Sequence, residues 1–206
     1  MNRATTLLAG AVGATAVWAG CRRYLSSSAD SIAYRRLSSV GGVERRKYPS
    51  VVVAETLADT EGEASGRLRD YLNGANTESV QLPQTAPVRI QPEPVTMTTP
   101  GQPSQAGSHV RMGVYLAPSF TPQTAPQPTS RTVRLTVETP RTVAVQPVSR
   151  LPTADRASRT DRATTTLLSA VADANLVAVG RPFVFEYPLA YLPESLTRTE
   201  VAVEVV

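Results

Sequence analysis

The sequence predicts an α+β domain in which a curved antiparallel sheet carries two helices. Short segments rich in valine and other β-branched residues recur along the chain, and two longer segments have apolar residues at helical spacing. An order of strands, helix and returning strands occurs twice, which suggests a pseudo-symmetric domain. The 17 prolines and 12 glycines predict many turns and argue against a bundle of long helices.

The first half begins with two strands and a helix. Residues 43–48 and 51–56 have β character and are separated by Pro49 and Ser50, which predicts a tightly paired couple of strands. The segment 60–63 (TEGE) fits the capping box S/T-x-x-E that starts a helix. Apolar residues then continue at helical spacing, and Gly74 supplies a stop, so we expect a helix of about four turns.

The remainder of the chain repeats this order. Residues 78–100 alternate short apolar pieces with prolines, and 101–108 form a predicted loop before a strand at 110–116. A turn-rich connection over 118–130 leads to the second set of elements. We expect strands at 132–139 and 142–148, a helix at 157–174, and closing strands at 183–187 and 200–205.

The N-terminus contains an uncharged segment, residues 4–21 (ATTLLAGAVGATAVWAGC). As a helix it would span about 27 Å, close to the hydrocarbon thickness of a bilayer. The basic residues after it favour an uncleaved single-pass anchor with the C-terminal domain in the cytoplasm. Two alternatives stay open: a lipoprotein or secretory signal ending at Cys21, and a packed helix of a soluble protein. Residues 22–42 are polar and predict a tether, which leaves 43–206 as the folded domain.

The composition excludes several classes of function. One cysteine and one histidine cannot form a structural zinc site, an iron–sulfur cluster or an intramolecular disulfide. The net charge of +4 comes with neither an aromatic-interleaved basic face nor a reading helix, so we expect no nucleic-acid partner. Phosphate-binding loops, nucleotide fingerprints and nucleophile elbows do not occur in the sequence. We therefore expect a protein that is not an enzyme.

Several segments, in collinear order, resemble one family. Residues 43–76 (VERRKYPSVVVAETLADTEGEASGRLRDYLNGAN) resemble the opening of the SOUL haem-binding proteins. The pieces 84–88 (QTAPV) and 97–100 (MTTP) are similar to the Met-Thr-Ala-Pro-Val elements of that family. Residues 114–145 are similar to its central strands and proline-rich turn, and 183–205 occupy the place of its C-terminal block. The resemblance covers most of the chain after the tether.

The resemblance implies a distorted antiparallel β-barrel with two helices and a groove for haem or another tetrapyrrole. The groove of the family runs along the first helix and a C-terminal loop. Carried over to this chain, the helix supplies Ser65, Leu68, Arg69 and Leu72, and the loop supplies Tyr187, Tyr191 and Leu192. A haem also needs cations for its propionates, and the candidates are Arg67, Arg69 and Arg198.

The chain departs from the family pattern around the expected site. Tyr191 stands in place of the loop tryptophan, and residues 197–200 (TRTE) replace Arg-Arg-Asn-Glu. The first strand reads RRKY over 45–48, without the histidine proposed as an iron ligand in some members. His109 is then a weak candidate, so we expect weak or absent axial ligation. The expected function is membrane-tethered haem buffering or transfer. The alternative is a module for another hydrophobic ligand, and the oligomeric state stays open.

Overall fold

The computed structural model describes residues 30–97, 105–149, 155–187 and 197–206. The predicted anchor (4–21) and the loop residues Tyr191 and Leu192 lie outside this part of the chain. Within it, no helix combines the length and the apolar character needed to cross a membrane. The hydrophobic N-terminal helix expected from the sequence therefore stays a prediction.

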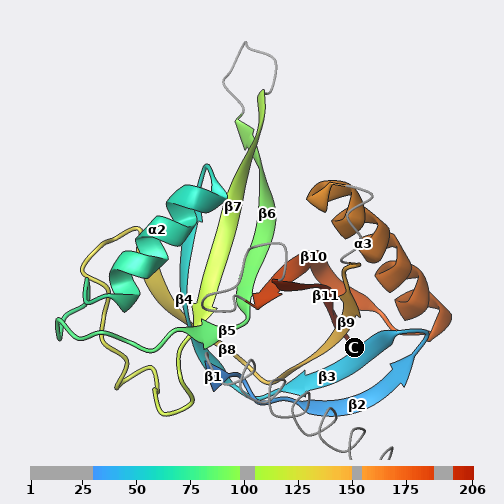
Figure 1. Cartoon of the computed structure of the whole chain (residues 1–206), viewed down its shortest axis with the longest axis horizontal. Helices are drawn as coiled ribbons and strands as arrows, with labels where there is room; N and C mark the ends of the chain where they lie inside the picture. The colour runs from blue at the N-terminus through green and yellow to red at the C-terminus, as the bar shows by residue number, and fades with distance from the viewer. Residues whose placement is uncertain (1–29, 98–104, 150–154, 188–196) are drawn as a thin grey trace, which may run out of the picture.

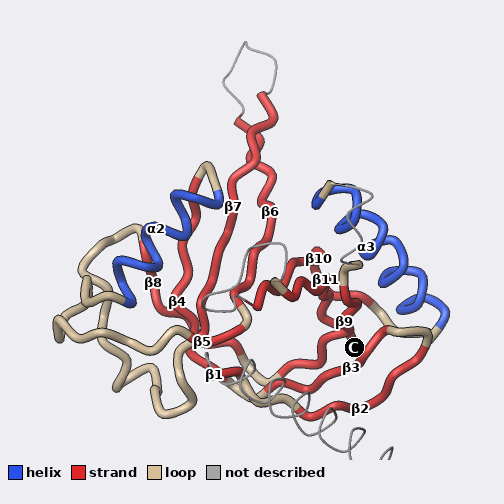
Figure 2. Tube along the Cα trace, in the orientation of Figure 1, coloured by secondary structure: helices blue, strands red, loops and turns tan. Residues whose placement is uncertain are grey.

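The described residues form a curled antiparallel sheet of nine strands with two helices, and two short strands pair separately (Figures 1 and 2). The order in the large sheet is β2-β3-β9-β11-β10-β6-β7-β4-β8. The strands are β1 (Asp30–Ser31), β2 (Arg35–Val40), β3 (Val43–Tyr48), β4 (Val51–Ala58), β5 (Thr85–Ala86), β6 (Val88–Met97), β7 (Gln105–Tyr115), β8 (Val133–Glu138), β9 (Arg141–Pro147), β10 (Ala178–Tyr187) and β11 (Arg198–Val205). The helices are α2 (Glu61–Leu72) and α3 (Arg156–Asp173).

The strand order is palindromic, as the pseudo-symmetry of the sequence predicts. The first half consists of β3, β4, α2, β6 and β7, and these correspond in order to β8, β9, α3, β10 and β11 of the second half. With each strand replaced by its counterpart, the order of these eight strands in the sheet is the same from either end. The centre of this symmetry is the pairing of β6 with β10, through Val88–Ile90 and Val184–Glu186. The two halves thus share one continuous sheet.

One predicted pairing is wrong. Strands β3 and β4 do not pair with each other: β3 pairs with β2 and β9, whereas β4 pairs with β7 and β8. The short link at Pro49 and Ser50 carries the chain from one half of the sheet to the other. The interruption at Pro140 does the same between β8 and β9. Each half therefore contributes its first strand to the edge of the opposite half, which ties the halves together.

The sheet begins earlier than predicted. Residues 35–40, expected within the polar tether, form β2 and pair with β3 across a turn at Gly41 and Gly42. Both glycines have positive φ angles, +57° and +86°, which favour glycine over residues with a Cβ. Ile32 is also buried, at 4% exposure. The folded part therefore includes residues that composition alone assigned to a linker.

The strands β6 and β7 form a long hairpin that projects from the sheet (Figure 1). Residues 105–108, predicted to be a loop, belong to β7, and prolines 92 and 94 lie within β6. Proline lacks the N–H that a central strand needs, so it is confined to strand edges. The pairing of β6 with β10 ends at Ile90, so the strand has only β7 as a partner at both prolines.

Both helices begin at the caps that the sequence supplies. Thr60 precedes α2, and its side chain accepts a hydrogen bond from the N–H of Glu63. The Glu63 carboxylate accepts from the N–H of Asp59, one residue before the position of an ideal capping box. Asp155 caps α3 through the N–H of Ser158. The helices thus match their predicted ranges within a few residues.

Three clusters make up the core. Helix α2 covers one cluster and α3 covers another. The strand residues of these two clusters alternate along the strands with those of the third cluster, so the two helices lie on one face of the sheet and the third cluster lies on the other. The third cluster joins Tyr48 of β3, Val53 of β4, Tyr115 of β7 and Phe185 of β10. Strand β3 lies near one end of the sheet order and β4 near the other, so the sheet curls around this cluster as a half-barrel with the helices outside.

Candidate functional site

A pocket of about 660 Å³ lies between α2 and the outer face of the sheet. Ligand pockets in proteins typically have volumes of about 300–1,000 Å³. The wall residues come from the helix, from the segment that follows it and from strands β6 and β7. They are Ser65, Leu68, Arg69, Leu72, Asn73, Gln81, Leu82, Pro83, Gln84, Val88, Met112 and Val114.

The helix side of the pocket consists of four residues that share one face of α2. Leu68 and Leu72 are buried, at 2% and 7% exposure, and Ser65 and Arg69 lie nearer the solvent. Their spacing of three and four residues places them in one row along the helix. These are the four helix residues that the family resemblance implied. Their role in binding a ligand stays a prediction.

Arg69 is the cation of this pocket. Its guanidinium donates to Ser65 Oγ over 3.4 Å, and among the described residues it has no carboxylate partner. An arginine with most of its N–H donors uncommitted can bind an acidic ligand group bidentately. The pocket therefore combines an apolar wall with a free positive charge at its edge.

The opposite wall was missed by the sequence analysis. Leu82, Val88, Met112 and Val114 are apolar residues of this wall. Met112 and Val114 alternate along β7 within the predicted strand 110–116, so period-two alternation was the available signal. The residues from the other segments could not be found in this way, because their approach depends on how the β6–β7 hairpin packs under α2.

The pocket residues fit a flat apolar ring with acidic substituents. A tetrapyrrole of this kind needs an apolar slot and a cationic edge, and an axial ligand is optional. The thioether of Met112 is a soft donor within the pocket wall. His109 lies on β7 three residues earlier, on the other face of the strand, where its Nδ1 is 2.8 Å from Asp59. In the described part of the chain, no group of three or more His, Cys, Asp or Glu side chains is placed to hold a metal ion.

Three of the predicted site residues lie elsewhere. Arg67 forms an ion pair with Glu63 and donates to the carbonyl of Leu57, away from the pocket. Tyr187 and Arg198 belong to a buried polar network on the inner face of the half-barrel, and neither lines the pocket. Glu186, the neighbour of Tyr187, nevertheless pairs with the pocket residue Val88, so β10 ends close to the pocket.

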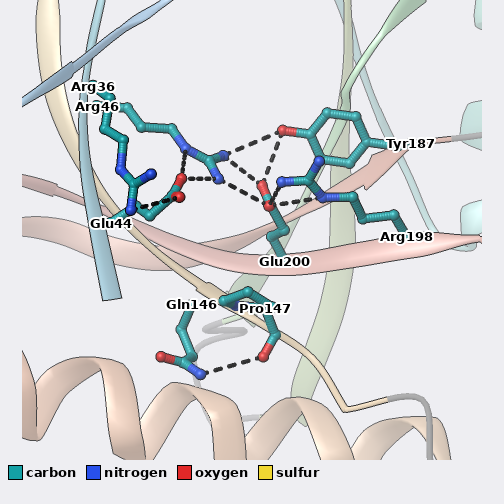
Figure 3. A network of polar contacts seen from close by, with 8 residues as sticks. All are labelled: Arg36, Glu44, Arg46, Gln146, Pro147, Tyr187, Arg198 and Glu200. Atoms are coloured by element: carbon teal, nitrogen blue, oxygen red, sulfur yellow. Dashed lines mark hydrogen bonds and ion pairs between the residues drawn. The ribbon is translucent and has the colours of Figure 1, made fainter. Parts of the chain in front are cut away.

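The buried network centres on Glu200, which is fully buried (Figure 3). Arg46, at 1% exposure, donates to its two carboxylate oxygens over 2.6 and 3.0 Å. Tyr187 Oη and Arg198 Nε each donate to the same carboxylate over 2.9 Å. Glu44 provides a second acceptor for Arg46, with its Oε2 at 2.8 Å from Nε. The charges within the half-barrel are thus paired and hydrogen-bonded, as burial requires.

The network shifts the pKa values of its members. Burial alone disfavours the charged form of Glu200, but the hydrogen bonds and charge of Arg46, together with Arg198, outweigh it and hold the pKa of Glu200 below its ordinary value. Burial raises the pKa of Tyr187, and the neighbouring Glu200 carboxylate adds to this effect. Glu200 is therefore an ionised structural group, and Tyr187 is a neutral donor to it.

Comparison with known proteins identifies the family. The sequence profile described as SOUL heme-binding protein matches residues 29–204, which is most of the chain. The chain belongs to this family. No curated protein matches the sequence.

Two solved structures share the fold. The C-terminal domain of EcmrR has 12% sequence identity and a TM-score of 0.50, and the match covers 84% of this chain and 98% of that one. An uncharacterized conserved protein from Listeria innocua has 9% identity and a TM-score of 0.55, with 80% and 92% covered. At these identities the likeness concerns the fold alone.

Proposed function

We propose that this SOUL-family protein binds haem or a related tetrapyrrole in the pocket under α2, and that it buffers or transfers this ligand without chemical change. The observation that carries the proposal is the pocket of about 660 Å³ that combines a wall of apolar side chains with Arg69, free of carboxylate partners, at its edge. The family match supports the ligand class. A protein that transfers a ligand needs a pocket that is open to solvent, and the half-buried Ser65 and exposed Arg69 at the rim are consistent with one.

The pocket residues divide the task of binding. Leu68, Leu72 and Val114 would contact the apolar ring faces, and Arg69 would pair with a propionate. The iron of haem would supply a redox centre. Among the lining residues, the strongest candidate ligand for this iron is the buried thioether of Met112. Thioethers are weak ligands compared with imidazole, so we propose micromolar affinity and weak axial ligation.

We further propose that the protein acts at the cytoplasmic face of a membrane. The support is the uncharged segment 4–21, followed by arginines at 22 and 23. Alkaline extraction of membranes from cells that express the full chain tests this, because an integral anchor resists extraction. Mass spectrometry of the native N-terminus distinguishes the anchor from a cleaved signal. Cleavage of a signal would occur just before Cys21 or shortly after it, and the segment before the cleavage site would be missing from the mature protein.

Titration of the full chain with haemin tests the ligand. In mild detergent, with detergent alone as blank, we expect a saturable change of the Soret band at one equivalent. The variant Ser65→Trp places a bulky ring at the pocket edge and should weaken binding about tenfold or more, which corresponds to about 1.4 kcal/mol. Asp70→Trp, at an exposed position of the same helix, is the matched control and should bind like the wild type.

Charge is tested separately. Arg69→Ala should weaken haemin binding about threefold to tenfold, because a partly exposed charged contact contributes about 0.7–1.4 kcal/mol. Arg162→Ala, an exposed arginine of α3, is the control for net charge. A haemin response equal in wild type and Ser65→Trp would contradict the site. A wild-type response no larger than that of an unrelated protein would favour the alternative of another hydrophobic ligand. Bleaching of the Soret band with reductant and oxygen would contradict the non-catalytic role.

A further inference from the structure

A second hollow, of about 300 Å³, lies at the outer end of β4, where it meets the start of β8 and the side of α2. Its wall contains one carboxylate, Glu55, and four arginines from three separate segments of the chain. These are Arg67 of α2, Arg111 of β7, Arg131 before β8 and Arg134 of β8. Four guanidinium groups around one carboxylate leave a formal excess of three positive charges in the wall.

The buried carboxylate arranges the cations. The Glu55 side chain is only 7% exposed, and three arginines converge on it: Arg89 at 3.0 Å, Arg111 at 3.6 Å and Arg134 at 2.8 Å. A guanidinium has five N–H donors in a rigid fork, so a contact with Glu55 leaves donors available on the other side. The ion pair with Glu55 therefore fixes the position of the exposed Arg134 guanidinium and leaves some of its N–H donors available for a ligand.

Carboxylates outside the wall neutralise part of this positive charge. Glu63 pairs with Arg67 and Glu93 with Arg111 from outside the wall. With both included, one positive charge remains, and it belongs to Arg131. This exposed side chain has no ion pair or hydrogen bond in the described part of the chain. Its charge is therefore not offset by a carboxylate of the described residues, and it lies beside three further guanidinium groups.

The surrounding backbone is well anchored. Thr56 Oγ1 donates to the carbonyl of Thr132 over 2.7 Å, and Arg67 donates to the carbonyl of Leu57 over 2.7 Å. The register of β4 and β8 ends at Thr56 and Val133, directly beside these contacts. The segment that carries Arg131 is thus tied to β4, and β4 is tied to the helix, which reduces the ordering needed when a ligand binds.

From this arrangement we infer that the hollow is a binding site for a small, multiply charged oxyanion of the phosphate class, free or as a phosphate ester. Guanidinium forks match the oxygen geometry of phosphate and bind it bidentately. The volume suits a ligand of one or two phosphate groups better than a large cofactor. The site shares no residue with the pocket under α2, and Arg67 points away from the row formed by Ser65 and Arg69.

Isothermal titration of the full chain at about 0.15 M ionic strength, where surface charges are screened beyond about 8 Å, tests the site. The probes are diphosphate, inorganic phosphate and glycerol 3-phosphate, with acetate as a monovalent control. We expect saturable binding at one site, tightest for diphosphate among the free anions, and none for acetate. Tighter binding of glycerol 3-phosphate than of inorganic phosphate would assign the site to an ester.

Arg131→Ala should weaken diphosphate binding about tenfold, as expected for loss of a charge-assisted contact of about 1.4 kcal/mol. It should leave thermal unfolding unchanged, because the side chain has no described partner. Arg181→Ala removes an equally exposed arginine from β10 and is the control for net charge. Absence of saturable binding, or equal weakening by both variants, would overturn the inference. Haemin titration of Arg131→Ala should match wild type, so the two sites can fail independently.

Discussion

The buried pair of Arg46 and Glu200 offers a quantitative test of the half-barrel interior. The change is Glu200→Gln, which keeps the size of the side chain but removes its charge. Arg46 then loses its contacts of 2.6 and 3.0 Å with the Glu200 carboxylate. Its remaining carboxylate partner is Glu44, whose side chain is 25% exposed. The amide of glutamine also brings a donor toward the guanidinium, where only an acceptor can bind.

Breaking one side of a buried ion pair costs about 3–5 kcal/mol. Because Glu44 still neutralises Arg46, we expect the lower end of that range, about 3 kcal/mol, for the loss in free energy of unfolding. For a domain of this size each kcal/mol lowers Tm by about 2–4 °C, so Tm should fall by about 6–12 °C. Urea unfolding followed by circular dichroism gives the free energy, and a thermal scan gives Tm.

Two further variants separate the buried pair from a general effect of charge. Glu63→Gln removes the exposed i,i+4 partner of Arg67 and should cost less than about 1 kcal/mol. The double variant Arg46→Met with Glu200→Met replaces the pair by apolar side chains and should recover most of the loss, since no unpaired buried charge remains. A Glu200→Gln variant as stable as Glu63→Gln would refute the reasoning.

Three other predictions concern single residues. The pKa of Glu200 lies below its ordinary value of 4.5, so the stability that the ionised carboxylate contributes is complete above pH 4.5 and is lost as the pH falls through the lowered pKa. In urea unfolding between about pH 3 and 5, the free energy of unfolding should therefore depend less steeply on pH in Glu200→Gln than in wild type. Burial raises the pKa of Tyr71 to about 12, so its contribution is complete below the ordinary value of 10.0 and declines as the pH rises toward 12. Tyr71→Phe should cost about 1–2 kcal/mol, since the phenol donates to a buried carbonyl, and should flatten that alkaline decline. A Cβ at Gly113 would lie 3.0 Å from Val53 Cγ1, so Gly113→Ala should destabilise the protein by about 1–3 kcal/mol. A Cβ at Gly66 of α2 would meet open space, so Gly66→Ala should stabilise it by about 0.5–1 kcal/mol. Chemical unfolding that ranks the two variants in the reverse order would contradict the packing.

Part of the candidate site was accessible from the sequence. The spacing of Leu68 and Leu72 with Ser65 and Arg69 shows that they share a helix face, and the family resemblance indicates that this face borders the groove. The strand residues Met112 and Val114 follow from alternation along β7, but nothing local shows that they lie opposite α2. The second hollow was not accessible at all, because its four arginines (Arg67, Arg111, Arg131 and Arg134) come from three separate segments.

Errors in the sequence analysis arose where tertiary pairing outweighs local composition. The polar residues 35–40 read as a linker, although the two glycines after them are a hairpin signal. The pair of prolines in β6 argued against a strand, but the free edge beyond Ile90 tolerates them. Tyr187 and Arg198 were predicted at a ligand rim; the structure shows both donating to Glu200, and their role in binding a ligand stays a prediction.

Sequence alone determined the two helices with the cap of the first, the approximate strands, their repeated order and the family, because these depend on contacts within about four residues or on collinear motifs. The exchange of first strands between the halves, the curl around the third cluster and the convergence of arginines on Glu55 were decided only by the tertiary structure. Strand partners lie many residues apart, and a strand's own pattern shows which side is apolar without showing which strand it will meet.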